Sequence, residues 1–130
     1  MFTRVFVNGW EELQTALENS ADRRTIVLFS GDFDPETGKS WCPYCTKAVP
    51  IIEDTIARGE LDEVDVCFIT CYVGTFKYWK TKTNEFRTQK FRLDGVPTLL
   101  EIGVTGKRMK GTEYLCNPDL IKFFFITDDE

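Results

Sequence analysis

The chain has 130 residues, of which 42% are hydrophobic and 28% are charged, and its formal net charge is −5 at pH 7. This composition is ordinary for a globular protein and excludes a disordered chain, so we expect a single domain over residues 1–130. The 21 acidic residues against 16 basic ones exclude the positive surface of a nucleic-acid-binding protein. No apolar run reaches the length of a signal peptide or a membrane-spanning helix, which predicts a cytoplasmic protein without a membrane partner.

The first quarter of the chain predicts a strand, a helix and a second strand. Residues 3–7 alternate with β-prone side chains, and Asn8 with Glu11 three positions later resembles a capping box that opens a helix through about Asn19. Residues 25–30 form a nearly continuous apolar run that is too short for a helix, which indicates a central strand covered on both faces.

A loop, a long helix and a third strand follow. Residues 31–40 are rich in Gly, Asp, Pro and Ser, which indicates a loop that leads to Trp41. Apolar positions between residues 45 and 58 repeat at helical spacing, and Pro50 is expected to kink this helix. Residues 64–73 then predict a strand, followed by a polar and aromatic stretch with a short helix near residues 84–90.

The last third of the chain predicts a β-hairpin and a helix. Residues 98–102 and 107–109 flank two glycines and indicate the hairpin, and Asn117-Pro118 then caps a helix through about residue 126. The acidic residues 128–130 indicate a solvated tail. This order predicts an α/β fold with a mixed central sheet of about five strands flanked by helices on both faces, which is the thioredoxin architecture.

The cysteine and histidine counts restrict the chemistry. Five cysteines are an odd number in a chain long enough to fold without disulfides, which argues against a secreted disulfide framework. The sequence contains no histidine, which excludes a Cys–His protease, a histidine metal site and an imidazole base. Proton transfer must therefore depend on cysteine, carboxylates, lysine or water.

Trp41-Cys42-Pro43-Tyr44-Cys45 places two thiols three residues apart at the point where the loop becomes a helix. The unpaired N–H groups and positive dipole end of a helix N-terminus lower a thiol pKa from about 8.5 to about 3.5–7.5. We therefore predict that Cys42 is the nucleophile and that Trp41 covers the dithiol. Cys45, one turn further along, is predicted to keep its proton until a mixed disulfide forms and then to attack Cys42 as the resolving thiol.

A C-x-x-C pair is also half of many zinc sites, and Cys67 with Cys71 is the obvious second half. Residues four apart on one strand are separated by roughly 13 Å, at about 3.3 Å per residue, so these two cysteines cannot bind one metal ion. We therefore expect no metal site. Cys67, Cys71 and Cys116 are interpreted as small buried side chains, with a redox role of Cys71 left open.

Val96-Pro97-Thr98 precedes the strand predicted at residues 98–102. A proline in this position often does no more than mark the start of a strand. In a chain with an upstream C-x-x-C helix, however, this is where a cis-proline loop would face the dithiol. Val96 would then offer its backbone groups to an extended substrate by strand addition.

Five segments resemble the thioredoxin domain-containing protein 17 family. They are GKSWCPYC at 38–45, CFITCYVG at 67–74, YWK at 78–80, NEFR at 84–87 and VPTLL at 96–100. The resemblance implies a cytosolic protein-disulfide reductase without a bound cofactor, in which Cys42 is the nucleophile and Cys45 its partner. It also implies that NADPH recharges this dithiol through thioredoxin reductase, and that the substrates are selected protein disulfides and small disulfides, with peroxidase activity in addition. We expect a monomer.

Two positions depart from related sequences. Tyr44 stands where the family carries Asp, so the motif reads C-P-Y-C, as in glutaredoxins. Residues 25–30 contain no carboxylate where ordinary thioredoxins keep a buried Asp near the resolving cysteine, which leaves Asp32, Asp34 or water as the proton acceptor of Cys45. Three alternatives to the reductase remain: a glutathione-dependent, glutaredoxin-like oxidoreductase, a non-catalytic redox-sensing interaction module, and a structural zinc module.

Overall fold

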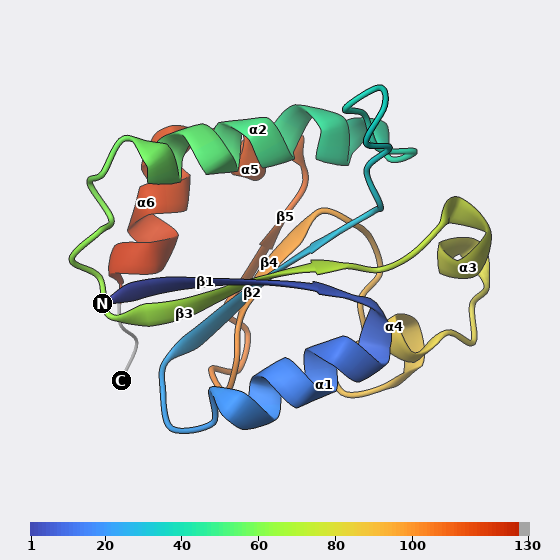
Figure 1. Cartoon of the computed structure of the whole chain (residues 1–130), viewed down its shortest axis with the longest axis horizontal. Coiled ribbons are helices and arrows are strands. Elements are labelled where there is room, and N and C mark those ends of the chain that lie inside the picture. The colour runs from blue at the N-terminus through green and yellow to red at the C-terminus, as the bar shows by residue number, and fades with distance from the viewer. Residues whose placement is uncertain (128–130) are drawn as a thin grey trace.

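A five-stranded mixed sheet with the order β1-β3-β2-β4-β5 lies at the centre of this computed structural model, which describes residues 1–127 (Figure 1). β1, β3 and β2 run parallel, and β4 and β5 are antiparallel to their neighbours. The strands are β1 (Phe2–Asn8), β2 (Thr25–Ser30), β3 (Val66–Tyr72), β4 (Thr98–Glu101) and β5 (Arg108–Lys110). The predicted mixed sheet and thioredoxin fold are confirmed.

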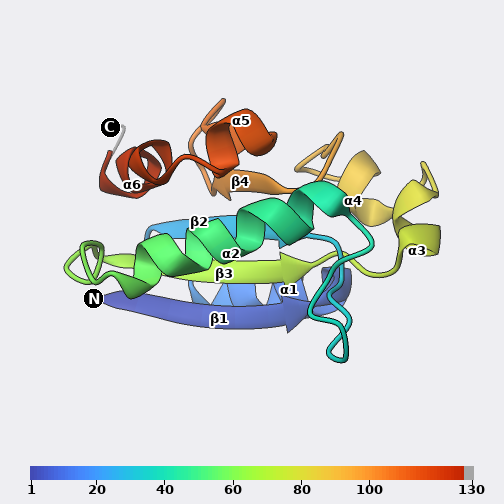
Figure 2. The same ribbon diagram turned by 90° about the horizontal axis from the view of Figure 1, so that it is seen from above.

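Helices cover both faces of this sheet, as Figure 2 shows for α2 on one side and α1 on the other. The helices are α1 (Gly9–Asn19), α2 (Pro43–Ala57), α3 (Phe76–Lys80), α4 (Glu85–Thr88), α5 (Thr112–Leu115) and α6 (Pro118–Ile126). Buried side chains of α2, α5 and α6 form one hydrophobic core with the sheet, and those of α1, α3 and α4 form the other. The sheet therefore separates two cores.

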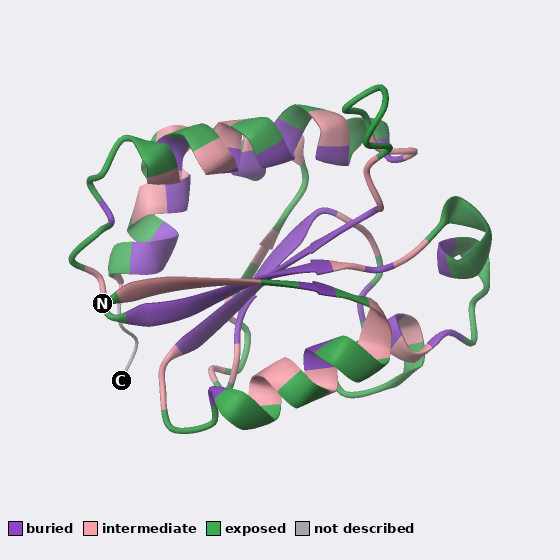
Figure 3. Ribbon diagram, viewed as in Figure 1, coloured by how far each residue is buried: buried purple, intermediate pink, exposed green. Residues whose placement is uncertain are grey.

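β2 is buried along its whole length, and β3 along all but its last residue, because both faces of the sheet carry helices (Figure 3). All six residues of β2 are buried, which explains why its sequence is continuously apolar and does not alternate. The register pairs Val27 with Ile69 on the parallel side and with Leu100 on the antiparallel side. The prediction of a central strand at residues 25–30 is therefore confirmed with the same bounds.

Other predicted elements are confirmed with shifted ends. The hairpin of β4 and β5 pairs Leu99 with Met109, and Asn117 caps α6 through hydrogen bonds from two backbone N–H groups to its side-chain oxygen. β3 begins two residues later than expected and ends one residue earlier, and α4 ends at Thr88 and not near residue 90. α2 continues through Pro50. The predicted acidic tail at residues 128–130 lies outside the described part of the chain.

The local predictions need correction at the start of α1 and at two short helices. Asn8 is the N-cap residue of α1, but its side chain makes no capping hydrogen bond, and Glu12 in place of Glu11 accepts from the Asn8 N–H, at 2.8 Å. The short helices α3 and α5 were not predicted, because elements of five and four residues are too short for a hydrophobic period to show.

Within residues 1–127, no helix is both long and apolar enough to span a bilayer.

The parallel strands end at the edge of the sheet where α2 begins (Figure 1). Loops at this edge join β2 to α2 and β3 to α3. Since binding and catalytic groups in open α/β sheets gather at the carboxyl ends of parallel strands, this edge is the place to look for a site.

Candidate active site

Cys42 and Cys45 lie at the N-terminus of α2, and both are free thiols in the structure. Cys42 is the N-cap residue, and Pro43 occupies the first turn, where its missing N–H costs the helix no hydrogen bond. The Cys45 backbone N–H donates to Cys42 Sγ at 3.2 Å. The sulfur of Cys42 therefore holds the position that a serine or aspartate oxygen holds in an ordinary N-cap.

Hydrogen bonds give the thiols of Cys42 and Cys45 different pKa values. The Cys45 thiol stabilises the thiolate of Cys42, and with the backbone N–H groups of Cys45 and Tyr44 it lowers the pKa of Cys42 to about 7, although burial opposes this. The same contact with Cys42, together with complete burial, raises the pKa of Cys45 far above its ordinary value. At pH 7 about half of Cys42 is therefore thiolate, while Cys45 keeps its proton.

The loop before β4 contacts the dithiol. The Val96-Pro97 peptide bond is cis, and the Cys42 thiol donates to the Val96 carbonyl oxygen at 3.4 Å. Thr98 Oγ1 donates to the Gly95 carbonyl oxygen at 2.7 Å and so closes the loop. The structure thus brings Val96 and Pro97, more than fifty positions along the chain, next to the cysteine that the sequence predicts as the nucleophile.

The ring of Trp41 closes one side of the site. Its Nε1–H donates to the Gly74 carbonyl oxygen at 2.9 Å, and its ring packs on Phe76 with centroids 5.5 Å apart. The same ring lies against Gly31, where an added Cβ would be only 2.7 Å from two of its carbons. The Gly31 N–H donates to Cys45 Sγ at 3.4 Å, so Trp41 covers backbone that touches the buried sulfur.

We expect Gly31→Ala to displace the Trp41 ring, because a Cβ within 3.0 Å of ring carbons forces one of the two to move. Overpacking of this kind costs about 1–3 kcal/mol, and the displaced ring would lose its hydrogen bond to Gly74. The variant should therefore unfold at lower denaturant concentration and show altered tryptophan fluorescence. Urea titration followed by fluorescence measures both effects.

The matched control is Gly95→Ala. Gly95 lies in the loop next to Val96, but an added Cβ there meets no atom within 4 Å, and the backbone has no positive φ. This variant should keep the wild-type unfolding midpoint and emission spectrum. Equal effects of the two substitutions would contradict the tight packing of Trp41 on Gly31.

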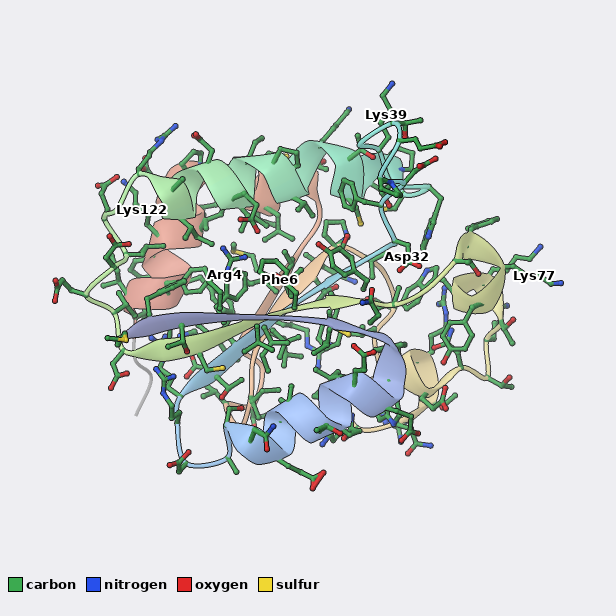
Figure 4. The ribbon with its side chains drawn as sticks, viewed as in Figure 1. Arg4, Phe6, Asp32, Lys39, Lys77 and Lys122 are labelled. Atoms are coloured by element: carbon green, nitrogen blue, oxygen red, sulfur yellow. The ribbon has the colours of Figure 1, made fainter. Side chains whose placement is uncertain are left out.

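The two carboxylates that sequence considerations offered as proton acceptors are engaged elsewhere. Asp32 Oδ1 accepts from the Gly74 N–H at 3.0 Å, and Asp34 Oδ1 accepts from the Glu36 N–H at 2.8 Å. Figure 4 shows Asp32 on the segment that leaves β2 for the loop before α2. Within residues 1–127, neither carboxylate makes a hydrogen bond to Cys45. Asp32 instead holds the loop whose Gly74 carbonyl binds the Trp41 indole.

Ser30 is the polar neighbour of Cys45 that sequence reasoning missed. It is fully buried at the end of β2, and its hydroxyl donates to the Gly31 carbonyl oxygen at 2.9 Å. Contact with Cys42 and burial dominate the raised pKa of Cys45, while the Gly31 N–H and the Ser30 hydroxyl act in the opposite direction. The signal in the sequence was a hydroxyl residue at the end of an otherwise apolar run.

Pro43 and Tyr44, the two residues between the cysteines, face outward. Pro43 is exposed, and 59% of the surface of Tyr44 is accessible. Tyr44 is therefore placed to meet a bound molecule and is not packed into the protein.

The remaining cysteines lie away from the dithiol. Cys67 and Cys71 are buried on β3 in the core shared with α1, on the opposite face of the sheet from Cys42 and Cys45, and Cys116 is half-buried. Burial raises the pKa of Cys71 to about 12. In the described part of the chain, no three Cys, Asp or Glu residues cluster in a way that could hold a metal ion.

Comparisons with known proteins point to one family. Residues 6–127 match the family model of the thioredoxin domain-containing protein 17-like, thioredoxin domain. Thioredoxin domain-containing protein 17 of Danio rerio is 38% identical over 129 residues, and that of Homo sapiens is 35% identical over 127 residues, each match covering 98% of both chains.

A plant relative matches part of the chain. The thioredoxin-like protein Clot of Arabidopsis thaliana is 40% identical over 84 residues, which cover 64% of this chain and 60% of that protein. The family model and the full-length relatives agree with the thioredoxin fold described above. The chain therefore belongs to the thioredoxin domain-containing protein 17-like family of thioredoxin-fold proteins.

Proposed function

We propose that this protein is a cytoplasmic, monomeric protein-disulfide reductase that consists of one domain and works through the Cys42/Cys45 dithiol. The observation that carries the proposal is the difference between the two thiols: hydrogen bonds lower the pKa of Cys42 to about 7, whereas that of Cys45 is strongly raised. An ionised thiol beside a protonated, buried one is the arrangement that a nucleophile and a resolving thiol require.

The reaction follows from this arrangement. The Cys42 thiolate attacks one sulfur of the substrate disulfide, the other sulfur leaves as a thiol, and a mixed disulfide joins the substrate to Cys42. Cys45 then loses its proton and attacks Cys42 Sγ, which releases the second substrate thiol. The substrate has gained two electrons, and the protein now holds a Cys42–Cys45 disulfide.

The family relationship supports NADPH, acting through thioredoxin reductase, as the source of the electrons that restore the dithiol. No cofactor bound to the protein itself is needed. Selected protein disulfides and small disulfides are the proposed substrates, and peroxidase activity is a further proposed property. The Val96 backbone is proposed to bind an extended substrate beside Cys42, because its carbonyl already contacts that sulfur.

A coupled assay tests the proposal directly. NADPH and thioredoxin reductase are mixed with the protein and a disulfide substrate, and NADPH consumption is followed. We expect consumption that depends on this protein. A parallel reaction with glutathione and glutathione reductase identifies the preferred donor, and no turnover with either donor would contradict a reductase.

A glutathione-dependent, glutaredoxin-like oxidoreductase is the second candidate function. Its supporting observation is Tyr44, which completes a C-P-Y-C motif and is exposed beside the dithiol. Turnover with glutathione alone would favour this candidate. Binding of a partner in one dithiol state without turnover would instead indicate a redox-sensing module, and stoichiometric zinc in protein purified under reducing conditions would indicate a zinc module.

Tyr44→Asp tests how residue 44 sets the reactivity of Cys42. A carboxylate there disfavours the Cys42 thiolate through like-charge repulsion, so the pKa of Cys42 should rise above about 7. Because residue 44 is exposed, water screens the repulsion, and we expect a rise of less than about one unit. We expect the potential of the wild type to be displaced from the thioredoxin value of roughly −270 mV toward the glutaredoxin range of roughly −200 to −230 mV. In Tyr44→Asp it should become more negative, by less than about 30 mV for a rise of less than one pKa unit.

Thiolate absorbance as a function of pH gives the pKa, and equilibration with a glutathione or dithiothreitol buffer gives the potential. Tyr44→Asn is the matched control, because it has nearly the size of Asp without the charge. If both variants behave like the wild type, the Cys45 thiol and the backbone N–H groups of α2 set the reactivity of Cys42, and the side chain of residue 44 does not.

A further inference from the structure

Residues 76–92, which contain α3 and α4, carry the opposite charge to the rest of the molecule. They hold six basic residues and one acidic residue, while the rest of the chain holds ten basic and twenty acidic residues. The basic residues are Lys77, Lys80, Lys82, Arg87, Lys90 and Arg92, and the acidic one is Glu85. A strongly positive segment is thus set into a chain whose net charge is −5.

The charges of this segment are not neutralised by neighbouring side chains. Within residues 1–127, none of the six basic residues forms an ion pair, whereas seven of the ten other basic residues do. Arg87 packs over the Trp79 ring and donates to the Trp79 carbonyl oxygen, so it supports α3. The other five are exposed, and together they are called the basic surface: Lys77, Lys80, Lys82, Lys90 and Arg92.

Buried polar contacts hold the backbone under the basic surface in one conformation. Asn84 is buried, and its side-chain amide donates to the carbonyl oxygens of Trp79 and Thr81, each at 2.9 Å. The Glu85 carboxylate accepts a hydrogen bond from the Tyr78 hydroxyl, so the one acidic side chain of the segment already has a partner. A ligand of the basic surface therefore meets cations on a backbone that is ordered before it binds.

Both ends of the segment adjoin the dithiol site. At its start, the Phe76 ring packs on the Trp41 ring with centroids 5.5 Å apart. Beyond its end, residues 93–95 lead to Val96, whose carbonyl oxygen accepts from the Cys42 thiol at 3.4 Å. An extended chain advances about 3.3 Å per residue. A polypeptide bonded to Cys42 through its half-cystine therefore reaches the basic surface with residues a few positions away.

We propose that the basic surface binds acidic stretches of polypeptide substrates that flank the half-cystine attacked by Cys42. The inference rests on the proposed disulfide exchange and names the class of substrate. That class is a protein or peptide disulfide with several Asp or Glu residues within a few positions of one cysteine. Complementary charges of this kind steer the encounter of two molecules, so the main effect is on the rate at which substrate and protein associate.

The charge pattern favours an acidic polypeptide over a nucleic acid. Four of the five cations are lysines, whose compact charge lacks the two-pronged contact that arginine makes with phosphate. Outside residues 76–92, acidic residues exceed basic ones by ten, and this excess repels a long polyanion that extends past the basic surface. A short acidic stretch meets the basic surface alone. The loop at residues 31–40 holds three acidic residues and one basic residue, which directs that stretch to α3 and α4.

Single-turnover reduction of three peptides tests the proposal without any reductase. Each peptide is a disulfide-linked dimer through one cysteine, which glutamates, serines or lysines flank on both sides. The pre-reduced protein gives two electrons to the peptide disulfide, two peptide thiols are released, and the Cys42–Cys45 disulfide forms. Each rate constant is divided by that for reduction of the same peptide by dithiothreitol, which removes the effect of the flanking charges on the disulfide itself.

The wild type should reduce the acidic peptide about fivefold faster than the neutral one at an ionic strength of about 0.01 M, where the Debye length is about 30 Å. One Lys–Glu pair about 7 Å apart in water changes a rate by about threefold, so two such pairs account for this factor. At about 1 M salt the ratio should fall close to one.

The net charge of the whole chain predicts the opposite order. If the charge of −5 governed the encounter, the basic peptide would be reduced fastest and the acidic one slowest. That order, or equal rates for the three peptides at low salt, would overturn the proposal while leaving disulfide reduction in place.

Lys77→Glu/Lys80→Glu should reverse the preference, so that the acidic peptide is reduced more slowly than the neutral one. The matched control is Arg58→Glu/Lys122→Glu, which changes the net charge by the same amount. Arg58 lies at the end of α2, and Figure 4 shows Lys122 at the opposite end of the molecule from Lys77. This control should retain the wild-type ratio. Equal ratios in the two double variants would show that net charge alone acts and would overturn the proposal.

A binding measurement separates the basic surface from the disulfide exchange. A cysteine-free acidic peptide is titrated into the isotope-labelled protein at low ionic strength, and the backbone amide signals are followed by NMR. The shifted signals should belong mainly to residues 76–92, and the shifts should be lost in Lys77→Glu/Lys80→Glu. An absence of shifts, or shifts of equal size throughout the chain, would overturn the proposal.

Two further outcomes have distinct meanings. If a single-stranded oligonucleotide of the same charge binds residues 76–92 more tightly than the acidic peptide, the basic surface is a nucleic-acid site and the proposal fails. If the acidic peptide binds there but neither the peptides nor cystine is reduced, the proposed function fails while the preference of the basic surface for acidic polypeptides is supported.

Discussion

Replacing Cys42 with Ser is expected to abolish disulfide reduction, with a loss of about a thousandfold or more. The hydroxyl of Ser is not ionised near pH 7, whereas the pKa of the Cys42 thiol is lowered to about 7. The second thiol of the site cannot take its place, since Cys45 is completely buried and its pKa is raised. Thiol release from a disulfide substrate measures the loss.

Cys45→Ser should have a different effect and trap a mixed disulfide between Cys42 and the substrate. The first exchange needs only Cys42, but the serine hydroxyl cannot attack the resulting disulfide. We expect one substrate per protein, visible as an added mass on the intact protein that a reducing agent removes. The same experiment with Cys42→Ser should show no adduct at this site.

Cys116→Ser is a suitable control, because Cys116 is half-buried at the end of α5 and is not part of the dithiol. It should reduce substrate like the wild type. If Cys45→Ser turns over normally with glutathione, the mechanism uses one thiol, and the glutaredoxin-like candidate replaces the reductase recharged through thioredoxin reductase.

Elements that carry a strong local signal could be predicted from the sequence. Residues 25–30 form a nearly continuous apolar run because helices cover both faces of the sheet there. Every position of β2 is buried, so the sequence shows the need for burial along the whole strand. The start of α6 was equally clear, because Asn117 and Pro118 each have a local physical reason to begin a helix. For such elements local preference and tertiary environment agree.

Elements whose position depends on tertiary contacts could not be predicted. α3 and α5 are too short to show a period, and α3 packs through one buried residue, Trp79, against a core formed by distant segments. Either Glu11 or Glu12 can reach back to Asn8 on sequence spacing alone, and only the conformation of the first turn selects Glu12.

The candidate site divides in the same way. The pair of cysteines and the cis-proline loop have recognisable sequence motifs. The contact between Cys42 and Val96 could therefore be predicted from the sequence. Ser30 has no such motif, and it is significant only because β2 ends against Cys45. Contacts that arise from strand order and helix packing are properties of the fold and carry no signature of their own.

Cys45 has a second role before it acts as the resolving thiol, and Cys45→Ala should reveal it. The hydrogen bond from the Cys45 side chain is the largest cause of the lowered pKa of Cys42. Without it, the pKa of Cys42 should rise from about 7 toward the ordinary thiol value of 9.0. The backbone N–H groups of Cys45 and Tyr44 remain in the variant, so the pKa should stop between these limits.

The direction of the pH dependence follows from this shift. Wild-type Cys42 is about half ionised at pH 7, whereas a thiol with a pKa near 9 is about one per cent ionised there. A more basic thiolate is also a better nucleophile, by roughly six- to tenfold for two pKa units, which offsets part of the loss. Alkylation of Cys42 by iodoacetamide at pH 7 should therefore slow by at most about five- to eightfold, the limit for a pKa near 9, and should recover at higher pH.

Cys45→Ser is the matched variant, because its hydroxyl can still donate a hydrogen bond to Cys42 Sγ. Its Cys42 should titrate close to the wild type, near pH 7, while Cys45→Ala titrates higher, and ultraviolet absorbance of the thiolate reports both values. Equal pKa values in the two variants would show that the backbone N–H groups at the start of α2 alone ionise Cys42. A higher value in Cys45→Ala only would show that the buried thiol prepares the nucleophile it later attacks.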